Sequence, residues 1–185
     1  MPGEIKIRRL VSSDVFVGFD CHVDPLNKFL RERAGQNQRK GLSATWLATL
    51  DDDVVGFATI VPGVVAPAPV IAANLVSRSQ QPSPHFPAPV LLIARMGTQK
   101  AAVRGESPPR GVGKQLLRHV VLEAIAMRDR FGCIGVYADA KPDAVGFYER
   151  FGFVAIRSPV GSDLSTGVFV SISTLDGALD PQPAR

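Results

Sequence analysis

The chain has 185 residues, of which 45% are hydrophobic and 21% charged, a composition typical of a folded domain with its own core. No apolar run reaches the roughly 20 residues that cross a bilayer, and the charged first ten residues predict that there is no secretory signal. The two cysteines lie far apart and form no metal-ligand cluster. We therefore expect a reduced, cytoplasmic protein with no membrane partner and no metal. The net charge of +4 permits a polyanionic partner without requiring one.

The N-terminal region predicts a strand followed by a helix. Residues 5–11 alternate between polar and apolar side chains, as a half-buried strand does. Asp24 and Pro25 then have the pattern of an N-cap followed by proline at the first helical position. Apolar side chains continue at helical spacing, so an amphipathic helix is predicted over residues 24–40, with Gly41 ending it.

The next segment predicts a β-hairpin and then a long connection. Residues 42–50 and 54–61 have the composition of strands, and an acidic turn at residues 51–53 separates them. Residues 62–89 contain seven prolines, which predicts a proline-rich insertion or long loop with a short helix near residues 70–76.

The C-terminal half predicts two helices between buried strands. Apolar side chains with a 3.6-residue period predict a long helix over residues 114–130, closed by Gly132, and Pro142 opens a short one. The strands are predicted at residues 90–96, 133–138, 154–157 and 168–173. We expect one α/β domain over residues 1–175, with a twisted, mostly antiparallel mixed sheet flanked by helices, and a flexible tail at residues 176–185.

The sequence PPRGVGKQLL leads a loop directly into the long helix. Free backbone N–H groups at a helix start attract anions, and Gly111 and Gly113 let a phosphate approach the backbone closely. Arg110 and Lys114 add positive charge beside them. Glycines at a helix entrance also occur in plain tight turns, so the segment alone leaves both interpretations open.

A second motif, AVGFYERFGF, covers residues 144–153 on the short helix. Phe147, Phe151 and Phe153 have the spacing of core residues, and Gly152 ends the helix. Tyr148 follows Phe147 and so points in a different direction, from which it could deliver a proton. A packed tyrosine with a satisfied hydroxyl is the alternative.

In this order, LLIARMGT, RGVGKQLL, CIGVYADA and GFYERFGF resemble the GNAT superfamily of N-acetyltransferases over roughly residues 5–175. The resemblance implies an acetyl-CoA co-substrate bound between the strands at 90–98 and 133–138. Backbone groups of Met96, Gly97 and Thr98 would pair with the pantetheine arm. The pyrophosphate would bind the turn formed by Arg110, Gly111, Val112, Gly113 and Lys114.

The same resemblance implies that Tyr148 protonates the departing thiolate and that an N–H near Met96 or Gly97 holds the oxyanion during direct transfer. Two positions depart from the family pattern. Pro108 stands where a glutamine or arginine begins the turn, and Lys141 stands where an asparagine often precedes the tyrosine helix. Because Pro108 has no N–H, one donor of the phosphate site is absent.

The segment Phe19-Asp20-Cys21, followed by Leu26, Phe29 and Leu30, is similar to the opening of GNAT toxins that acetylate the α-amino group of aminoacyl-tRNA and so block translation. His22 stands where those toxins usually have glycine. Five basic against two acidic side chains give residues 22–42 a net charge of +3. The tRNA-binding residues expected from the resemblance and this charge are Lys28, Arg31, Arg33, Arg39, Lys40 and Arg95.

The acceptor has alternatives at this stage. A small-molecule amine or a protein amine would also suit an N-acetyltransferase, and a non-catalytic acyl-CoA-binding or partner-binding module would explain the Pro108-Pro109 departure. The basic residues have an alternative as a solvated helix face. The resemblance further implies a small DNA-binding antitoxin as partner and a homodimer.

Overall fold

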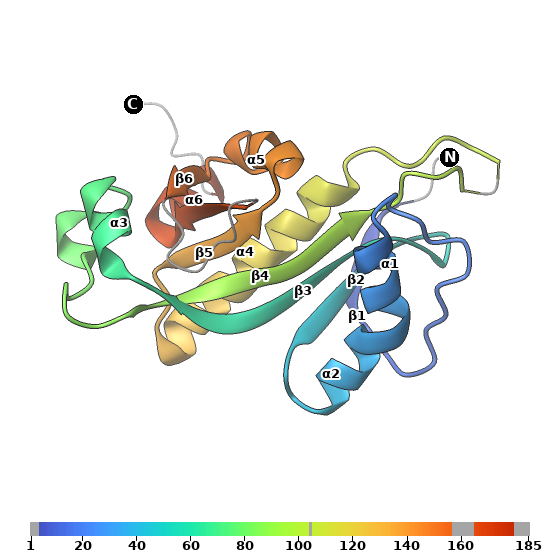
Figure 1. Cartoon of the computed structure of the whole chain (residues 1–185), viewed down its shortest axis with the longest axis horizontal. Coiled ribbons are helices and arrows are strands. Elements are labelled where there is room, and N and C mark those ends of the chain that lie inside the picture. Colours follow the sequence, from blue (N-terminus) through green and yellow to red (C-terminus); the bar gives the residue numbers. More distant parts are fainter. Residues whose placement is uncertain (1–3, 104, 157–164, 180–185) are drawn as a thin grey trace. The chain divides into compact units, whose positions relative to one another are not determined.

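The computed structural model describes residues 4–103, 105–156 and 165–179 (Figure 1). Seven strands form a mixed sheet in the order β1-β2-β3-β4-β5-β7-β6, with helices flanking it, which confirms the predicted α/β class. The chain divides into two compact units. Unit 1 comprises residues 1–61 and 93–120, and unit 2 comprises residues 62–92 and 121–185.

Three elements contribute residues to both units, namely β3 (Asp53–Val65), β4 (Ala88–Thr98) and α4 (Val112–Phe131). Unit 1 also contains β1 (Lys6–Arg9), α1 (Asp24–Phe29), η1 (Leu30–Ala34), α2 (Gly35–Arg39) and β2 (Ala44–Leu50). Unit 2 also contains α3 (Pro67–Ala72), η2 (Arg78–Gln80), β5 (Gly135–Ala140), α5 (Pro142–Glu149), β6 (Val154–Ile156), β7 (Thr166–Ser171) and α6 (Ile172–Leu179).

The predicted helix over residues 24–40 is present but is not a uniform α-helix. A π-helical stretch, η1, separates α1 from α2. Asp24 is the first helical residue, whereas the extended Val23 occupies the capping position without a side-chain cap, so the predicted N-cap was wrong. Gly41, with φ of 70°, follows the last turn as predicted.

The helical segment packs on β2 and β3 in unit 1 through its buried side chains. Leu30 is 1% exposed and Ala34 is fully buried. They belong to a core cluster that also contains Leu10, Phe19, Cys21, Leu47 and Phe57. This apolar seam confirms the amphipathic pattern read from the sequence.

The hairpin of β2 and β3 is formed as the sequence predicts. The two strands are antiparallel, and Leu50 pairs with Asp53 across the turn. Asp51 and Asp52 have φ of 46° and 69°, so both adopt the left-handed conformation that aspartate tolerates in a two-residue turn.

Residues 62–89 are more regular than the prolines predict. Strand β3 continues through Pro62 to Val65. Its pairing with β2 ends at Ile60, so Pro62 lies where β3 has no neighbour on the β2 side, and this is a position where a strand tolerates proline. Pro67 then begins α3, three residues before the short helix that was predicted.

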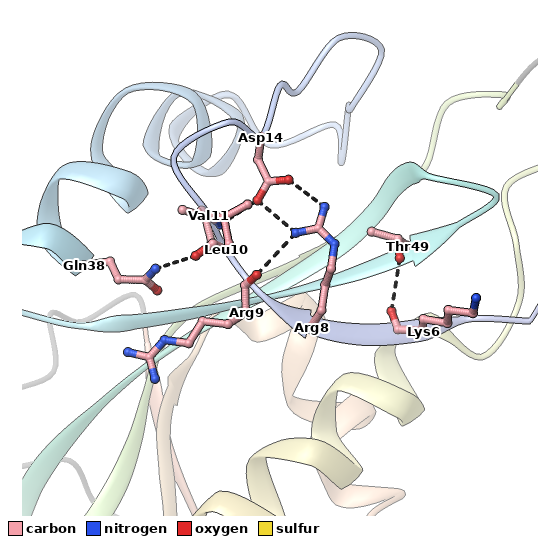
Figure 2. Close-up of polar contacts among 8 residues, drawn as sticks. All are labelled: Lys6, Arg8, Arg9, Leu10, Val11, Asp14, Gln38 and Thr49. Carbon is pink, nitrogen blue, oxygen red and sulfur yellow. Dashed lines mark hydrogen bonds and ion pairs between the residues drawn. The ribbon is translucent and has the colours of Figure 1, made fainter.

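Two sets of side-chain hydrogen bonds hold the loop between β1 and α1 (Figure 2). The Arg8 guanidinium donates to both Asp14 carboxylate oxygens, at 2.6 and 3.0 Å, and Asp14 also accepts from the Val11 N–H at 2.7 Å. Gln38 at the end of α2 donates to the Leu10 carbonyl at 2.5 Å. The basic helical segment is therefore tied to the edge of the sheet at its C-terminal end.

The end of unit 2 differs from the prediction of a strand over residues 168–173 and a loose tail. Strand β7 ends at Ser171, whose hydroxyl accepts a hydrogen bond from the Thr174 N–H at 3.2 Å and thereby caps helix α6. Residues 176–179 are helical, so the expected tail was wrong there. Residues 180–185, like Arg157, lie outside the described residues.

Candidate active site

Met96, Gly97 and Thr98 are the last three residues of β4, in unit 1. Gly97 is buried, and a Cβ at this position would lie 3.1 Å from Phe57 Cε1 and 3.3 Å from Cys21 Sγ, closer than most real Cβ contacts. A side chain at position 97 would therefore displace one of these two neighbours. Between Met96 and Thr98, the end of β4 thus presents only the peptide groups of Gly97 and no side chain.

The glycine turn begins the long helix two residues earlier than its apolar period predicts. Gly111 has φ of 80°, and its carbonyl accepts a hydrogen bond from the Gln115 N–H at 3.0 Å. The helix starts at Val112, so the N–H groups of Val112, Gly113 and Lys114 lie in its first turn and have no intrahelical acceptor. These donors and the helix dipole suit a phosphate.

The side chains beside this turn carry the expected positive charge. Arg110 and Lys114 are both exposed, one directly before the turn and the other in the first helical turn. Pro108 and Pro109 precede them and have no N–H to offer. The donors for an anion are therefore limited to the turn and the helix start.

Gly56 on β3 brings the turn and the end of β4 together, and the sequence reasoning missed it. A Cβ at position 56 would lie 2.6 Å from Val112 Cγ1, 3.0 Å from Leu116 Cδ1 and 3.2 Å from the Gly97 carbonyl oxygen. Helix α4 therefore contacts β3 where β3 has no side chain. An isolated glycine inside a strand pattern is the signal that could have revealed this close approach.

Tyr148 lies on α5 in unit 2 and is only 6% exposed. Its ring makes edge contacts with Phe147 and Phe153, with both pairs of ring centroids 5.2 Å apart. Phe153 is buried as predicted, whereas Phe147 and Phe151 are half-buried. The aromatic cluster fixes the tyrosine ring in place.

The surroundings of Tyr148 keep its hydroxyl protonated. Burial raises the pKa of Tyr148 to about 12, because the apolar environment disfavours the phenolate. Within the described part of the chain, its hydroxyl has no hydrogen-bond partner. At neutral pH this hydroxyl is therefore protonated and able to donate a hydrogen bond.

Five of the six predicted basic residues lie on the helical segment of unit 1 or at its C-cap, and the sixth, Arg95, lies on β4 and contacts that segment. The Arg95 guanidinium carbon lies 5.4 Å from the centre of the Phe29 ring, a cation–π distance. The side chains of all six residues are exposed, namely Lys28, Arg31, Arg33, Arg39, Lys40 and Arg95. The charge is thus available to a polyanion.

The other candidate reactive groups are buried. Cys21 and Cys133 are 5% and 6% exposed, and desolvation raises the pKa of both thiols, which does not suit a nucleophile. Within residues 4–103, 105–156 and 165–179, no cluster of three or more histidine, cysteine or acidic side chains is placed to hold a metal. No helix in these ranges is both long and apolar enough to span a bilayer.

Comparison with known proteins gives matches over most of the chain. The model of the acetyltransferase (GNAT) domain matches residues 41–155. A tRNA-acetylating toxin of Mycobacterium tuberculosis (strain ATCC 25618 / H37Rv) is 31% identical over 154 residues, covering 83% of this chain and 86% of the toxin.

Two solved structures have the same fold. A bacterial toxin superposes with a TM-score of 0.80 at 21% identity, covering 99% of both chains. The toxin AtaT, solved in complex with acetyl-methionyl-tRNAfMet, superposes with a TM-score of 0.77 at 18% identity, covering 96% of this chain and all of that one. With a family match over more than half of its residues, the chain belongs to the GNAT family of acetyltransferases.

Proposed function

We propose that this chain is a toxin that transfers the acetyl group of acetyl-CoA to the α-amino group of aminoacyl-tRNA and so blocks translation. The observation that carries the proposal is the similarity to the mycobacterial tRNA-acetylating toxin, which extends over most of both chains. The exposed basic side chains beside the end of β4 support a polyanionic acceptor more than a small amine.

Acetyl-CoA would be held by two sets of backbone groups in unit 1. The peptide groups of Met96, Gly97 and Thr98 would pair with the pantetheine arm. The first-turn N–H groups of α4 would bind the pyrophosphate, with Arg110 and Lys114 beside it. The left-handed Gly111 and the space around it support this fit, since no atom outside its chain neighbours lies within 4 Å of where its Cβ would be.

The chemistry needs one new bond and one broken bond. The acceptor amine attacks the thioester carbonyl carbon, the C–S bond breaks, and the proton lost by nitrogen balances the one gained by sulfur. A backbone N–H at Met96 or Gly97 would stabilise the negative oxygen. The Tyr148 hydroxyl would donate to the sulfur as its charge develops.

The pKa of Tyr148 defines the form of this last step. A free thiol has a pKa of about 8.5, so complete proton transfer to it from a hydroxyl with a pKa of about 12 is uphill. We therefore expect Tyr148 to stabilise the departing sulfur through its hydrogen bond and to be reprotonated at once from the acceptor nitrogen. No acyl-enzyme is needed, and both thiols are buried.

The proposal includes the partners expected of such a toxin. Aminoacyl-tRNA is the proposed substrate, and the protein is proposed to act in the cytoplasm. The proposed protein partners are a small DNA-binding antitoxin and a second copy of the chain. A mutant of the toxin AtaT, which has the same fold, has been solved bound to the C-terminus of the antitoxin AtaR and acetyl-CoA, which supports the antitoxin as a partner.

The test is acetylation of bulk aminoacyl-tRNA in the presence of labelled acetyl-CoA. We expect the label on the α-amine of the esterified amino acid, located by nuclease digestion and mass spectrometry. Transfer to small amines alone would show a GNAT enzyme with another acceptor. If no amine releases CoA above background although acetyl-CoA binds, the chain is a binding module instead.

A further inference from the structure

A chain of buried polar groups joins the start of α1 to the end of β4 in unit 1. Asn27 and Gln99 are each only 4% exposed, although both carry side-chain amides. Asn27 Nδ2 donates to Asp20 Oδ1 at 2.8 Å, and the Asp20 N–H donates to Gln99 Oε1 at 2.8 Å. Asp20 therefore connects two buried amides that are 72 positions apart in the sequence.

Both amides also bond to the loop at residues 18–21, and Gln99 bonds to Ala101 as well. Asn27 Oδ1 accepts from the backbone N–H of Cys21 and from its thiol, each at 3.1 Å. Gln99 Nε2 donates to the carbonyls of Gly18, at 3.0 Å, and Ala101, at 3.2 Å. The oxygen and the nitrogen of both side-chain amides thus have hydrogen-bond partners.

Backbone contacts extend the connection into the sheet. The Gln99 N–H donates to the Val55 carbonyl of β3 at 2.8 Å, and the Lys100 N–H donates to the Asp20 carbonyl at 2.8 Å. The Cys21 thiol lies against Gly97, where a Cβ would be 3.3 Å from it. Loop 18–21 is therefore fixed to the strand end where the acetyl group is proposed to bind.

The other end of the connection is the basic helix. Lys28 follows Asn27 directly, and Arg31 lies one turn further along. Arg95, near the end of β4, stacks on Phe29 of the same helix. Asn27 and Gln99 thus lie between these charges and the end of β4.

We propose that Asn27 and Gln99 are positioning residues, which hold the basic face of α1 against the end of β4 so that the amine of a bound acceptor meets the acetyl group. This inference rests on the proposed function. Amides are suited to the role because hydrogen bonds fix direction, whereas apolar side chains of the same size would allow the helix to slide. Neither side chain touches the reacting atoms.

The test uses Asn27→Ala and Gln99→Leu in the full chain with bulk aminoacyl-tRNA and acetyl-CoA. Because misplacement of a bound group lowers its reaction rate steeply, we expect kcat/KM for aminoacyl-tRNA to fall by about tenfold to a hundredfold in either variant. The Kd for acetyl-CoA, measured by calorimetry, should stay within about twofold, since the backbone groups of β4 and α4 that would bind it are not substituted.

A double variant and a matched control separate positioning from general loosening. Since both amides act through Asp20, the double variant should lose little more than the worse single variant, whereas additive losses would contradict one connected unit. Leu30→Val disturbs the same helical segment at a site that is 1% exposed, and its side chain makes none of the hydrogen bonds of the network. It should leave the kcat/KM for aminoacyl-tRNA nearly unchanged.

Each remaining outcome is decisive. The inference would be overturned if kcat/KM for aminoacyl-tRNA fell as far in Leu30→Val as in Asn27→Ala. It would also be overturned if Asn27→Ala lost as much affinity for acetyl-CoA as it loses in kcat/KM. An active wild type whose kcat/KM is unaffected by Asn27→Ala would overturn the inference alone. A wild type that leaves every aminoacyl-tRNA unmodified would overturn the proposed function as well.

Discussion

Val112 occupies the space that a side chain at Gly56 would need, because a Cβ at position 56 would lie 2.6 Å from Val112 Cγ1. Val112 is 2% exposed and is the first residue of α4, so the contact fixes the start of the helix that carries the glycine turn. The same Cβ would be 3.2 Å from the Gly97 carbonyl on β4. One missing side chain thus sets the positions of both proposed acetyl-CoA-binding elements in unit 1.

Gly56→Ala should weaken acetyl-CoA binding by about tenfold or more, equivalent to at least about 1.4 kcal/mol. Valine is stiff in a helix, so the helix start has to move, which costs about 1–3 kcal/mol of stability as well. S-acetylpantetheine lacks the pyrophosphate, so in calorimetry Gly56→Ala should lose much less affinity for it than for acetyl-CoA. Gly63→Ala on the same strand meets Leu92 Cβ at an ordinary 3.4 Å and serves as the control. An equal loss for both ligands would contradict a role in placing the turn.

Tyr148→Phe should lower kcat by about 10²- to 10⁴-fold while leaving the fold and the Kd for acetyl-CoA unchanged, because the ring contacts remain. Since the pKa of Tyr148 is about 12, the wild-type kcat should show no alkaline loss from this group below about pH 11. The pH–rate profile and single-turnover kinetics check both points. Tyr137→Phe, which removes the hydroxyl that donates to Asp139 at 2.6 Å, is the matched control. Full activity of Tyr148→Phe would remove Tyr148 from the mechanism.

The Arg8–Asp14 pair should make stability depend on acid pH. The hydrogen bonds from the Arg8 guanidinium lower the pKa of Asp14, so the carboxylate form stabilises the folded chain. This contribution is present above the unfolded pKa of about 3.9 and is lost as the pH falls through the lower folded value. Arg8 is partly exposed and solvent screens the pair, so we expect about 1 kcal/mol. Urea titrations from pH 7 to pH 3 should show a smaller acid loss for Asp14→Asn than for the wild type.

Local patterns predicted most elements because their signals lie within a few residues. The acidic turn at Asp51 and Asp52, the apolar period of α4 and the glycines that end helices all act on adjacent backbone, and each is found in place. The end of β7 was missed although its signal is also local. Ser171 caps α6, and a serine between apolar residues reads equally well as part of a strand.

The parts of the site that the sequence did not predict depend on long-range contacts. Gly56 matters because of Val112, which lies 56 positions later, and Asn27 matters because of Asp20 and Gln99. A buried amide and an exposed amide look the same in a single sequence. The turn and Tyr148 were predicted as site residues because each belongs to a short motif, whereas the supporting contacts need the folded chain.

Both thiols should be inert in the folded protein. Cys21 and Cys133 are buried, and burial raises the pKa of each thiol. A thiol reagent at pH 8 should label both within minutes in urea and far more slowly in buffer. Because the folded pKa values lie above the unfolded ones, the neutral thiols favour the folded chain. Their contribution to the free energy of unfolding is present below about pH 8.5 and falls as the pH rises further. Rapid labelling of Cys21 in the native chain would show that loop 18–21 opens.

Reversing charge at Lys28 and Arg31 should weaken tRNA binding without changing acetyl-CoA affinity. Both side chains are exposed on the helical segment that the Arg95–Phe29 contact joins to β4. Each lost phosphate contact should also reduce the slope of log K against log salt by roughly 0.7–0.9, so filter binding from 50 to 300 mM salt counts the contacts. Lys6→Glu, at an exposed position on β1, changes the net charge as much as Lys28→Glu alone and is the control for that single variant. An unchanged salt slope in the Lys28→Glu, Arg31→Glu double variant would place the acceptor elsewhere on the molecule, even if the enzyme still acetylates aminoacyl-tRNA.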